Sequence, residues 1–215
     1  KFKSGGGTLY DIEYLTQETG KRVAAFGYWA GFAGAYVSLK VWISQLKKEE
    51  CPPLSTFNDK RKLLKEISNE INSVKTLPSA IIIGSLGRVG TGVSDFCENL
   101  SLIVKKWDLT ETVSGGPFHE ILNHEILFNC VVATPKTPVF FQPNYIASKR
   151  NLSVIGDIAC DPDSDYNPIP IYSTPTTWSK PGLNIASNPR LDIMAIDNLP
   201  SLLPKESSID FAEQI

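Results

Sequence analysis

The sequence has little of what marks a metal or redox site. Four cysteines occur among 215 residues, and no two of them form a C-x-x-C pair, so neither a zinc knuckle nor a redox dithiol is indicated. The two histidines, His119 and His124, stand five positions apart. That spacing separates them by about 140° on a helix, whereas a helical zinc-protease site needs i and i+4. No metal is expected, and both histidines are expected at the surface.

Charge of one sign and long hydrophobic runs are also scarce. The formal net charge of -2 gives no electrostatic basis for binding nucleic acid. The apolar stretch over residues 23–39 contains a G-x-x-x-G at Gly27 and Gly31, but it is at the short limit for a membrane span and Lys40 closes it. We expect a buried helix over 30–48 and no membrane insertion.

A leader segment is also missing from the printed sequence. The chain begins at Lys1 without a methionine or a basic and then apolar segment, so we expect a piece of a longer protein. The absence of paired cysteines favours a reduced compartment, and we expect a cytoplasmic monomer. A peroxisomal address is the alternative, since the true carboxyl terminus is expected to lie beyond Ile215.

What the sequence does have is a strand–turn–helix–strand pattern over residues 78–108. A β-branched run, Ala80 to Ile83, predicts a strand buried on both faces of a parallel sheet. Glycine-rich residues 84–90 follow, then a helix-compatible segment, Arg88 to Asn99, and a second apolar run from Leu102 to Trp107. This order is typical of a dinucleotide-binding βαβ unit.

Each residue type in that pattern has a physical role. Gly87 and Gly90 fill the second and third positions of a G-x-G-x-x-G frame, and Ser85 takes the first. Glycine lets the backbone approach a pyrophosphate, which the first helical turn then binds through free N–H groups. Asp108, which ends the second strand, can accept hydrogen bonds from the adenosine ribose and would repel the 2′-phosphate of NADP. NAD is therefore predicted, although S-adenosylmethionine enzymes place an acid at the same point.

The remaining chain predicts an α/β architecture of the Rossmann type, a doubly wound parallel sheet with part of a second domain. An amphipathic helix over 57–74 is expected to cover the sheet, and a final helix is expected within 199–215. The expected further strands are Ile126–Val132, Leu152–Ile158, Leu191–Ile196 and a short pair at Tyr10–Leu15 and Val23–Phe26. Asp157, at the end of one strand, is either a crevice residue or a turn cap.

Four strings extend beyond these general signals: GGGTLYDIEYL from Gly5, RVAAFGYWAGFAGA from Arg22, IIIGSLGRVG from Ile81 and KWDLTETVSGGPF from Lys106. On these strings the chain resembles the fungal NAD-dependent, lysine-forming saccharopine dehydrogenases, of the alanine dehydrogenase and transhydrogenase group. The resemblance implies oxidation of saccharopine to lysine and 2-oxoglutarate with hydride transfer to NAD, the last step of α-aminoadipate lysine biosynthesis. The catalytic lysine and histidine of that family lie upstream of Lys1, so no catalytic acid or base is assigned in this chain.

The resemblance also implies a division of the chain and a set of contacts. Residues 1–29 would be part of the substrate domain, 30–56 an interdomain helix and linker, 57–198 the NAD-binding domain and 199–215 a return segment. Arg22 and Phe26 match substrate contacts. The matches to cofactor contacts are Lys21, Gly87, Arg88, Asp108, Thr112, Val132, Ile158, Ile196, Asp197, Asn198 and Leu199. For Phe26, Val132 and Ile158, ordinary core packing is the alternative.

Two other functions stay open. One is an amino acid oxidoreductase that resembles alanine dehydrogenase. The other is a noncatalytic module that only binds NAD. An upstream lysine and histidine in the complete reading frame would distinguish an enzyme from such a module.

Overall fold

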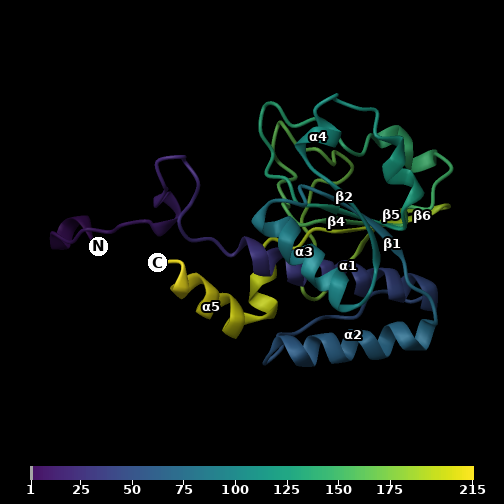
Figure 1. Ribbon diagram of the computed structural model, residues 1–215, viewed down its shortest axis with the longest axis horizontal. Helices are drawn as coiled ribbons and strands as arrows, with labels where there is room; N and C mark the ends of the chain where they lie inside the picture. The colour runs from purple at the N-terminus through teal and green to yellow at the C-terminus, as the bar shows by residue number, and fades with distance from the viewer. Residues whose placement is uncertain (1) are drawn as a thin grey trace.

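The computed structural model describes residues 2–215; Lys1, with which the expected substrate-domain segment begins, lies outside the described residues (Figure 1). Six strands form one sheet in the order β2-β1-β3-β4-β6-β5, and all neighbours pair in parallel except β5 with β6. The expected Rossmann-type α/β fold is confirmed. The strands are β1 Ser79–Ile83, β2 Ile103–Trp107, β3 Ile126–Asn129, β4 Val154–Asp157, β5 Leu183–Ser187 and β6 Arg190–Met194.

The described part of the chain has five α-helices: α1 Gly27–Lys47, α2 Lys60–Val74, α3 Arg88–Asn99, α4 Leu109–Thr112 and α5 Pro204–Glu213. Short 3-10 helices are η1 Lys3–Gly5, η2 Ile12–Tyr14, η3 His119–Asn123, η4 Pro143–Ala147 and η5 Leu199–Leu202. The helix predicted over 88–99 is confirmed at both ends. The helix predicted over 30–48 is confirmed and begins three residues earlier, at Gly27.

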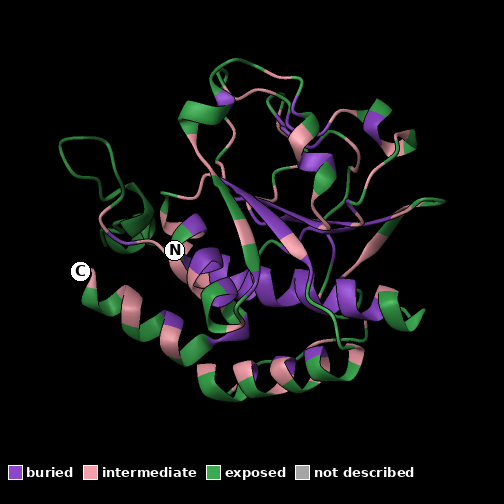
Figure 2. Cartoon of the chain, turned by 45° about the vertical axis from the view of Figure 1, so that its right-hand side comes forward, coloured by how far each residue is buried: buried purple, intermediate pink, exposed green. Residues whose placement is uncertain are grey.

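The long helix α1 is the centre of the core. Almost its whole middle is buried, and it lies directly under the sheet (Figure 2). Glycine permits α1 to touch α3 backbone to backbone, since a Cβ atom on Gly31 would lie 1.9 Å from the Val89 carbonyl oxygen. A Cβ atom on Gly92 would lie equally close, 1.9 Å, to the Tyr28 carbonyl oxygen. The G-x-x-x-G signal in this apolar stretch thus reflects close helix packing. Within residues 2–215, no helix has the length and apolar character needed to cross a bilayer.

The amphipathic helix α2 lies on the outer side of α1, and α1 comes between it and much of the sheet (Figure 1). This arrangement differs from the expectation that α2 itself covers the sheet. Asp59 caps α2 by accepting a hydrogen bond from the Lys62 N–H at 2.9 Å. On the facing side, the buried Lys40 of α1 forms ion pairs with Glu66 and Glu70 of α2. A charged contact therefore joins two helices whose apolar faces share one core.

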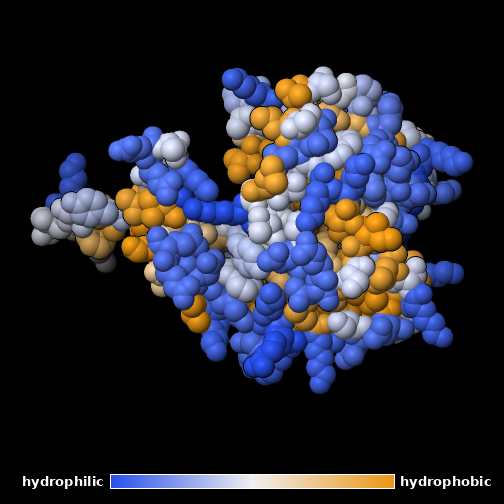
Figure 3. Space-filling model, in the orientation of Figure 1, coloured by the Kyte–Doolittle hydropathy of each residue, from blue (hydrophilic) through white to orange (hydrophobic). Residues whose placement is uncertain are grey.

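The expected strands at Tyr10–Leu15 and Val23–Phe26 are wrong. The first range contains η2, and the segment forms only an isolated bridge between Thr16 and Arg22 around the expected turn. A lone pair of short strands is marginal without a core to cover. Several apolar side chains of this arm are exposed, and orange atoms gather there in Figure 3.

Strands β3 and β4 are shorter than predicted at their carboxyl ends, β2 and β6 are each shorter by one residue, and one strand was missed. β3 ends at Asn129 and β4 at Asp157, because these two side chains bind loop N–H groups at the strand ends. The missed strand β5 forms an antiparallel hairpin with β6 and lies at the edge of the sheet. Its half-exposed residues show no buried apolar run from which it could be predicted.

Candidate functional site

The glycine turn joins the carboxyl end of β1 to the start of α3. Gly84 has a φ of +86°, and a Cβ atom on Gly90 would lie 2.1 Å from the Gly84 carbonyl oxygen. Gly87 is the N-cap of α3 and adds no side-chain cap. The first turn of α3 therefore faces the carboxyl edge of the sheet without a side chain in front of it. This is the geometry in which a helix N-terminus binds phosphate.

Asp108 lies beside this turn, as the sequence predicts. Its Oδ2 accepts a hydrogen bond from the Leu86 N–H at 2.9 Å, and its Oδ1 accepts one from the Leu109 N–H at 2.9 Å. The second bond caps α4, where the Glu111 carboxylate accepts the Asp108 N–H in return. The capping box adds the Glu111 N–H as a third donor to the Asp108 side chain. A carboxylate offers about four acceptor positions, so about one remains for a ribose hydroxyl. Asp108 is thus held at the glycine turn and does not point away from it.

A hollow of about 220 Å³ adjoins Asp108 and is called here the Asp108 hollow. It brings together three predicted cofactor contacts: Asp108, Thr112 and Val132. Thr112 is buried and its hydroxyl donates to the Asp108 carbonyl oxygen at 3.0 Å, whereas Val132 is 70% exposed. Val132 is therefore not a core residue. Gly84, Leu109, Val131, Thr134, Lys136, Thr137, Pro138 and Phe140 complete the lining.

A second hollow, of about 590 Å³, lies where α1 begins and the chain leaves β6. It is called here the Arg22–Asn198 hollow. It joins the two predicted substrate contacts, Arg22 and Phe26, to Asp197 and Asn198, although more than 170 positions separate the two pairs in the sequence. Its other lining residues are Ala25, Gly27, Ala30, Pro200, Ser201, Pro204, Ser207 and Ser208.

The glycine turn connects the two hollows. The Arg88 guanidinium at the start of α3 donates hydrogen bonds to the carbonyl oxygens of Arg22, at 2.9 Å, and Val23, at 3.2 Å. This side chain therefore anchors the segment before α1, and a phosphate contact of Arg88 would come from its backbone N–H. Phe26 stacks on Phe211 of α5 with ring centroids 4.3 Å apart, so α5 forms one wall. The predicted sites thus follow one edge of the sheet.

The other predicted contacts are placed differently. Ile158, Ile196 and Leu199 are at most 6% exposed and belong to the main core cluster. Their side chains face the interior. For Ile158, this agrees with the alternative of ordinary core packing that the sequence alone leaves open. Lys21 is exposed beside the turn at 18–20 and lines neither hollow. Arg22 also forms an exposed ion pair with Glu13 at 2.8 Å.

Asp157 proves to be a buried turn cap. It is 1% exposed, and its carboxylate accepts hydrogen bonds from the Asn129 amide at 2.9 Å and the Tyr172 hydroxyl at 2.8 Å. The Cys160 N–H donates to it as well. Burial raises the pKa of Asp157, and the hydrogen bonds from Tyr172 and Asn129 oppose that rise. This network holds the loop after β4 to the ends of β3 and β4.

The histidines form no site with other ligands. Within residues 2–215, no three His, Cys, Asp or Glu side chains are arranged to hold a metal ion. His119 is exposed as expected, but the expectation for His124 is wrong: its side chain is 15% exposed and lies 3.5 Å from Glu120. Glu120 and His124 are four positions apart, and His124 follows η3 as its C-cap residue.

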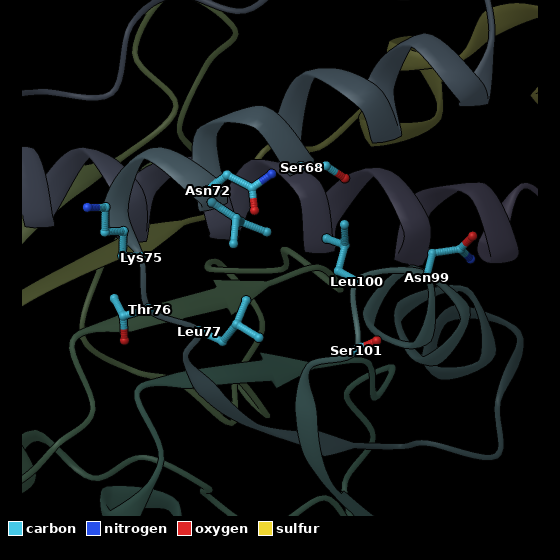
Figure 4. A pocket seen from close by; sticks show the side chains of 9 residues that line it. Ser68, Asn72, Lys75, Thr76, Leu77, Asn99, Leu100 and Ser101 are labelled. Carbon is cyan, nitrogen blue, oxygen red and sulfur yellow. The ribbon is translucent and has the colours of Figure 1, made fainter.

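A still larger hollow, of about 680 Å³, lies at the opposite edge of the sheet. Figure 4 shows side chains from α2, from the turn before β1 and from the turn after α3 facing a common space. Its lining residues include Asn72, Leu77 and Leu100. Ligands of open parallel sheets bind at the carboxyl ends of the strands, and this hollow lies at the amino ends. Its size alone does not make it the functional site.

Sequence reasoning missed several residues of the carboxyl edge. Lys136 lines the Asp108 hollow, and Ser201 and Ser208 line the Arg22–Asn198 hollow. Trp178 donates its indole N–H to the Asn198 Oδ1 at 2.9 Å. Lys136 and Trp178 lie in loops, Ser201 in η5 and Ser208 within α5, and no catalytic or binding motif marks any of them.

Together, the fold and this edge define the class: a Rossmann-type α/β domain with two hollows along the carboxyl edge of its sheet. No protein-family model matches the chain. It is 40% identical over its whole length to "Saccharopine dehydrogenase [NAD(+), L-lysine-forming]" of Candida glabrata. It is 38% identical to the Neurospora crassa protein and 36% identical to the Yarrowia lipolytica protein of the same name, again over the whole chain. The resemblance seen in the sequence motifs is confirmed, and the chain is a relative of these dehydrogenases. It spans about 61% of the length of the curated relatives it matches.

Proposed function

We propose that this chain is the cofactor-binding part of an NAD-dependent saccharopine dehydrogenase that forms L-lysine. The observation that carries the proposal is the hydrogen bond from the Leu86 N–H to the Asp108 carboxylate. It joins the acid at the end of β2 to the glycine turn, which is the arrangement that receives an adenosine ribose next to a pyrophosphate. The three relatives described above carry NAD(+) in their names.

The residues along this edge support NAD as the cofactor. Asp108 and Thr112 line the adenosine end, and the N-terminus of α3 at Gly87 and Arg88 receives the diphosphate. The Arg22–Asn198 hollow lies on the other side of α3 and would receive the nicotinamide half together with the substrate. NAD, when bound, supplies the acceptor for hydride from the carbon beside the secondary amine of saccharopine.

The chain's own residues bind and orient. The Arg22 guanidinium suits a substrate carboxylate, and saccharopine carries three of them. Phe26, fixed by stacking on Phe211, gives the hollow an apolar wall. A proton-transferring lysine and histidine are expected upstream, so the chain assigns neither role to its own side chains.

The same proposal covers organisation and location. Residues 2–29 and 199–215 would join a substrate domain, 30–56 would link the domains, and 57–198 would bind NAD. The exposed apolar arm before α1 supports a further domain for it to pack against. We place the enzyme in lysine biosynthesis, as a cytoplasmic monomer, with the peroxisome as the alternative location.

Absorbance of NADH tests the activity most simply. Purified full-length protein should produce NADH when saccharopine and NAD are both added, and it should produce none with alanine as the substrate. Alanine-dependent NADH production without saccharopine-dependent production would contradict the proposal. The 215-residue chain alone should turn over neither compound.

A further inference from the structure

Asn198 is held by a residue from a distant loop. The Trp178 indole N–H donates to the Asn198 Oδ1 at 2.9 Å. Trp178 lies in the proline-rich segment between β4 and β5, which backbone hydrogen bonds tie to the linker before α2 and to the residue after β6. The Leu54 N–H donates to the Trp178 carbonyl at 2.8 Å, and the Thr176 N–H donates to the Ala195 carbonyl at 2.9 Å. The segment that carries the indole is therefore held in place by hydrogen bonds that do not involve Asn198.

This contact decides which way the Asn198 amide faces. An indole N–H is only a donor, so the atom that receives it must be the amide oxygen. The amide nitrogen, with its two donor hydrogens, is left for the exposed side of Asn198, which lines the Arg22–Asn198 hollow. If the amide rotated by 180°, two donors would face each other. The hollow that Arg22 also lines therefore has an amide donor whose orientation is set by Trp178.

We propose that Trp178 is a positioning residue that orients Asn198 to donate a hydrogen bond to the carboxamide oxygen of the nicotinamide. The inference rests on the proposed function, because it assumes NAD in the crevice. The position of the hollow decides which half of NAD would reach Asn198. Asp108 receives the adenosine end. The Arg22–Asn198 hollow lies past the N-terminus of α3, where Gly27 approaches Arg88. With the adenosine end at Asp108, the part of NAD that reaches Asn198 is the nicotinamide.

Calorimetry of the full-length protein with NAD and with ADP-ribose tests this assignment, because ADP-ribose lacks the nicotinamide. Trp178→Phe should weaken NAD binding about three- to tenfold and leave ADP-ribose binding unchanged. Asn198→Asp replaces the donor by an acceptor on an exposed side chain and should weaken NAD at least as much. Trp29→Phe is the matched control, since the Trp29 indole N–H has no hydrogen-bond partner in the described structure.

A double-mutant cycle separates positioning from a merely structural role. If Trp178 acts through Asn198, Trp178→Phe should have no further effect on NAD binding in an Asn198→Ala background. An effect that persists there, or one that is equal for NAD and ADP-ribose, would overturn the inference while leaving the proposed function intact. If unmodified protein bound neither ligand, the proposed cofactor site would fail and the inference with it.

Discussion

Two glycines of the phosphate turn should respond in opposite ways to the same substitution. At Gly90, a Cβ atom would lie 2.1 Å from the Gly84 carbonyl oxygen and 2.6 Å from the Ser85 Cα. Both are backbone atoms, so no side chain can rotate to make room. At Gly87, the nearest heavy atom would be 3.5 Å away, which is ordinary contact. Gly90 therefore serves packing, whereas Gly87 leaves space for a ligand.

The magnitudes follow from this difference. Overpacking costs about 1–3 kcal/mol, and a backbone clash places Gly90→Ala near the upper end. In a chain of this size, about 3 kcal/mol lowers Tm by about 6–12 °C. Gly87 has a φ of -75°, which alanine adopts freely, so Gly87→Ala gains about 0.4–1 kcal/mol from the less flexible unfolded chain. Alanine is a poorer N-cap than glycine by a similar amount, so the net change in stability should be under about 1 kcal/mol. Its methyl group should instead weaken NAD binding by about ten- to hundredfold.

Thermal unfolding and calorimetry measure the two effects separately. Gly5→Ala is the control, because no atom lies within 4 Å of a Cβ atom at Gly5 and its substitution should change neither Tm nor affinity. A Gly90→Ala protein with unchanged Tm would refute the close-packing argument. A Gly87→Ala protein that binds NAD normally would refute the assignment of the diphosphate to this turn.

Three further outcomes are expected. Asp108→Asn keeps the cap of α4 but removes the charge, so calorimetry should show NAD binding weakened about tenfold and NADP binding unchanged or stronger; equal weakening of both would contradict it. Because burial raises the pKa of Asp157, its native state holds the proton more tightly, so this residue should make the unfolding free energy fall as pH rises from about 4 towards the raised pKa. Urea unfolding should show that this part of the slope disappears in Asp157→Asn. Lys40→Met should lower the unfolding free energy by about 1–3 kcal/mol by leaving Glu66 and Glu70 unpaired, and an unchanged urea midpoint would exclude a role for the pair.

Much of the fold was predictable because its signals are local. A β-branched run, a glycine turn and an amphipathic period each depend on neighbours in sequence, and β1, α3 and α2 begin within three residues of their expected starts. The edge strand β5 was not predictable, since its half-exposed residues obtain their pairing only from β6. The prediction of strands in the arm before α1 was wrong for the opposite reason. Its residues alternate as in a strand, but they have no partner strand in the described chain.

The candidate site shows the same division. Asp108 could be found because it follows a strand at a fixed distance from the glycines, and the structure joins it to Leu86. Trp178 and Lys136 could not, because only the tertiary fold carries their loops to the carboxyl edge. Asp157 illustrates a third case: the strand end was visible in the sequence, but only its burial and its bond from Tyr172 identify it as a cap.

The central claim is that the acid at Asp108 and the bare turn before α3 receive NAD. Calorimetric titration of the full-length protein with NAD, NADP and S-adenosylmethionine, at one ionic strength, tests it most directly. The account predicts saturable binding of NAD, at least tenfold weaker binding of NADP because its 2′-phosphate meets the Asp108 carboxylate, and no binding of S-adenosylmethionine. Preference for NADP or S-adenosylmethionine over NAD would contradict it.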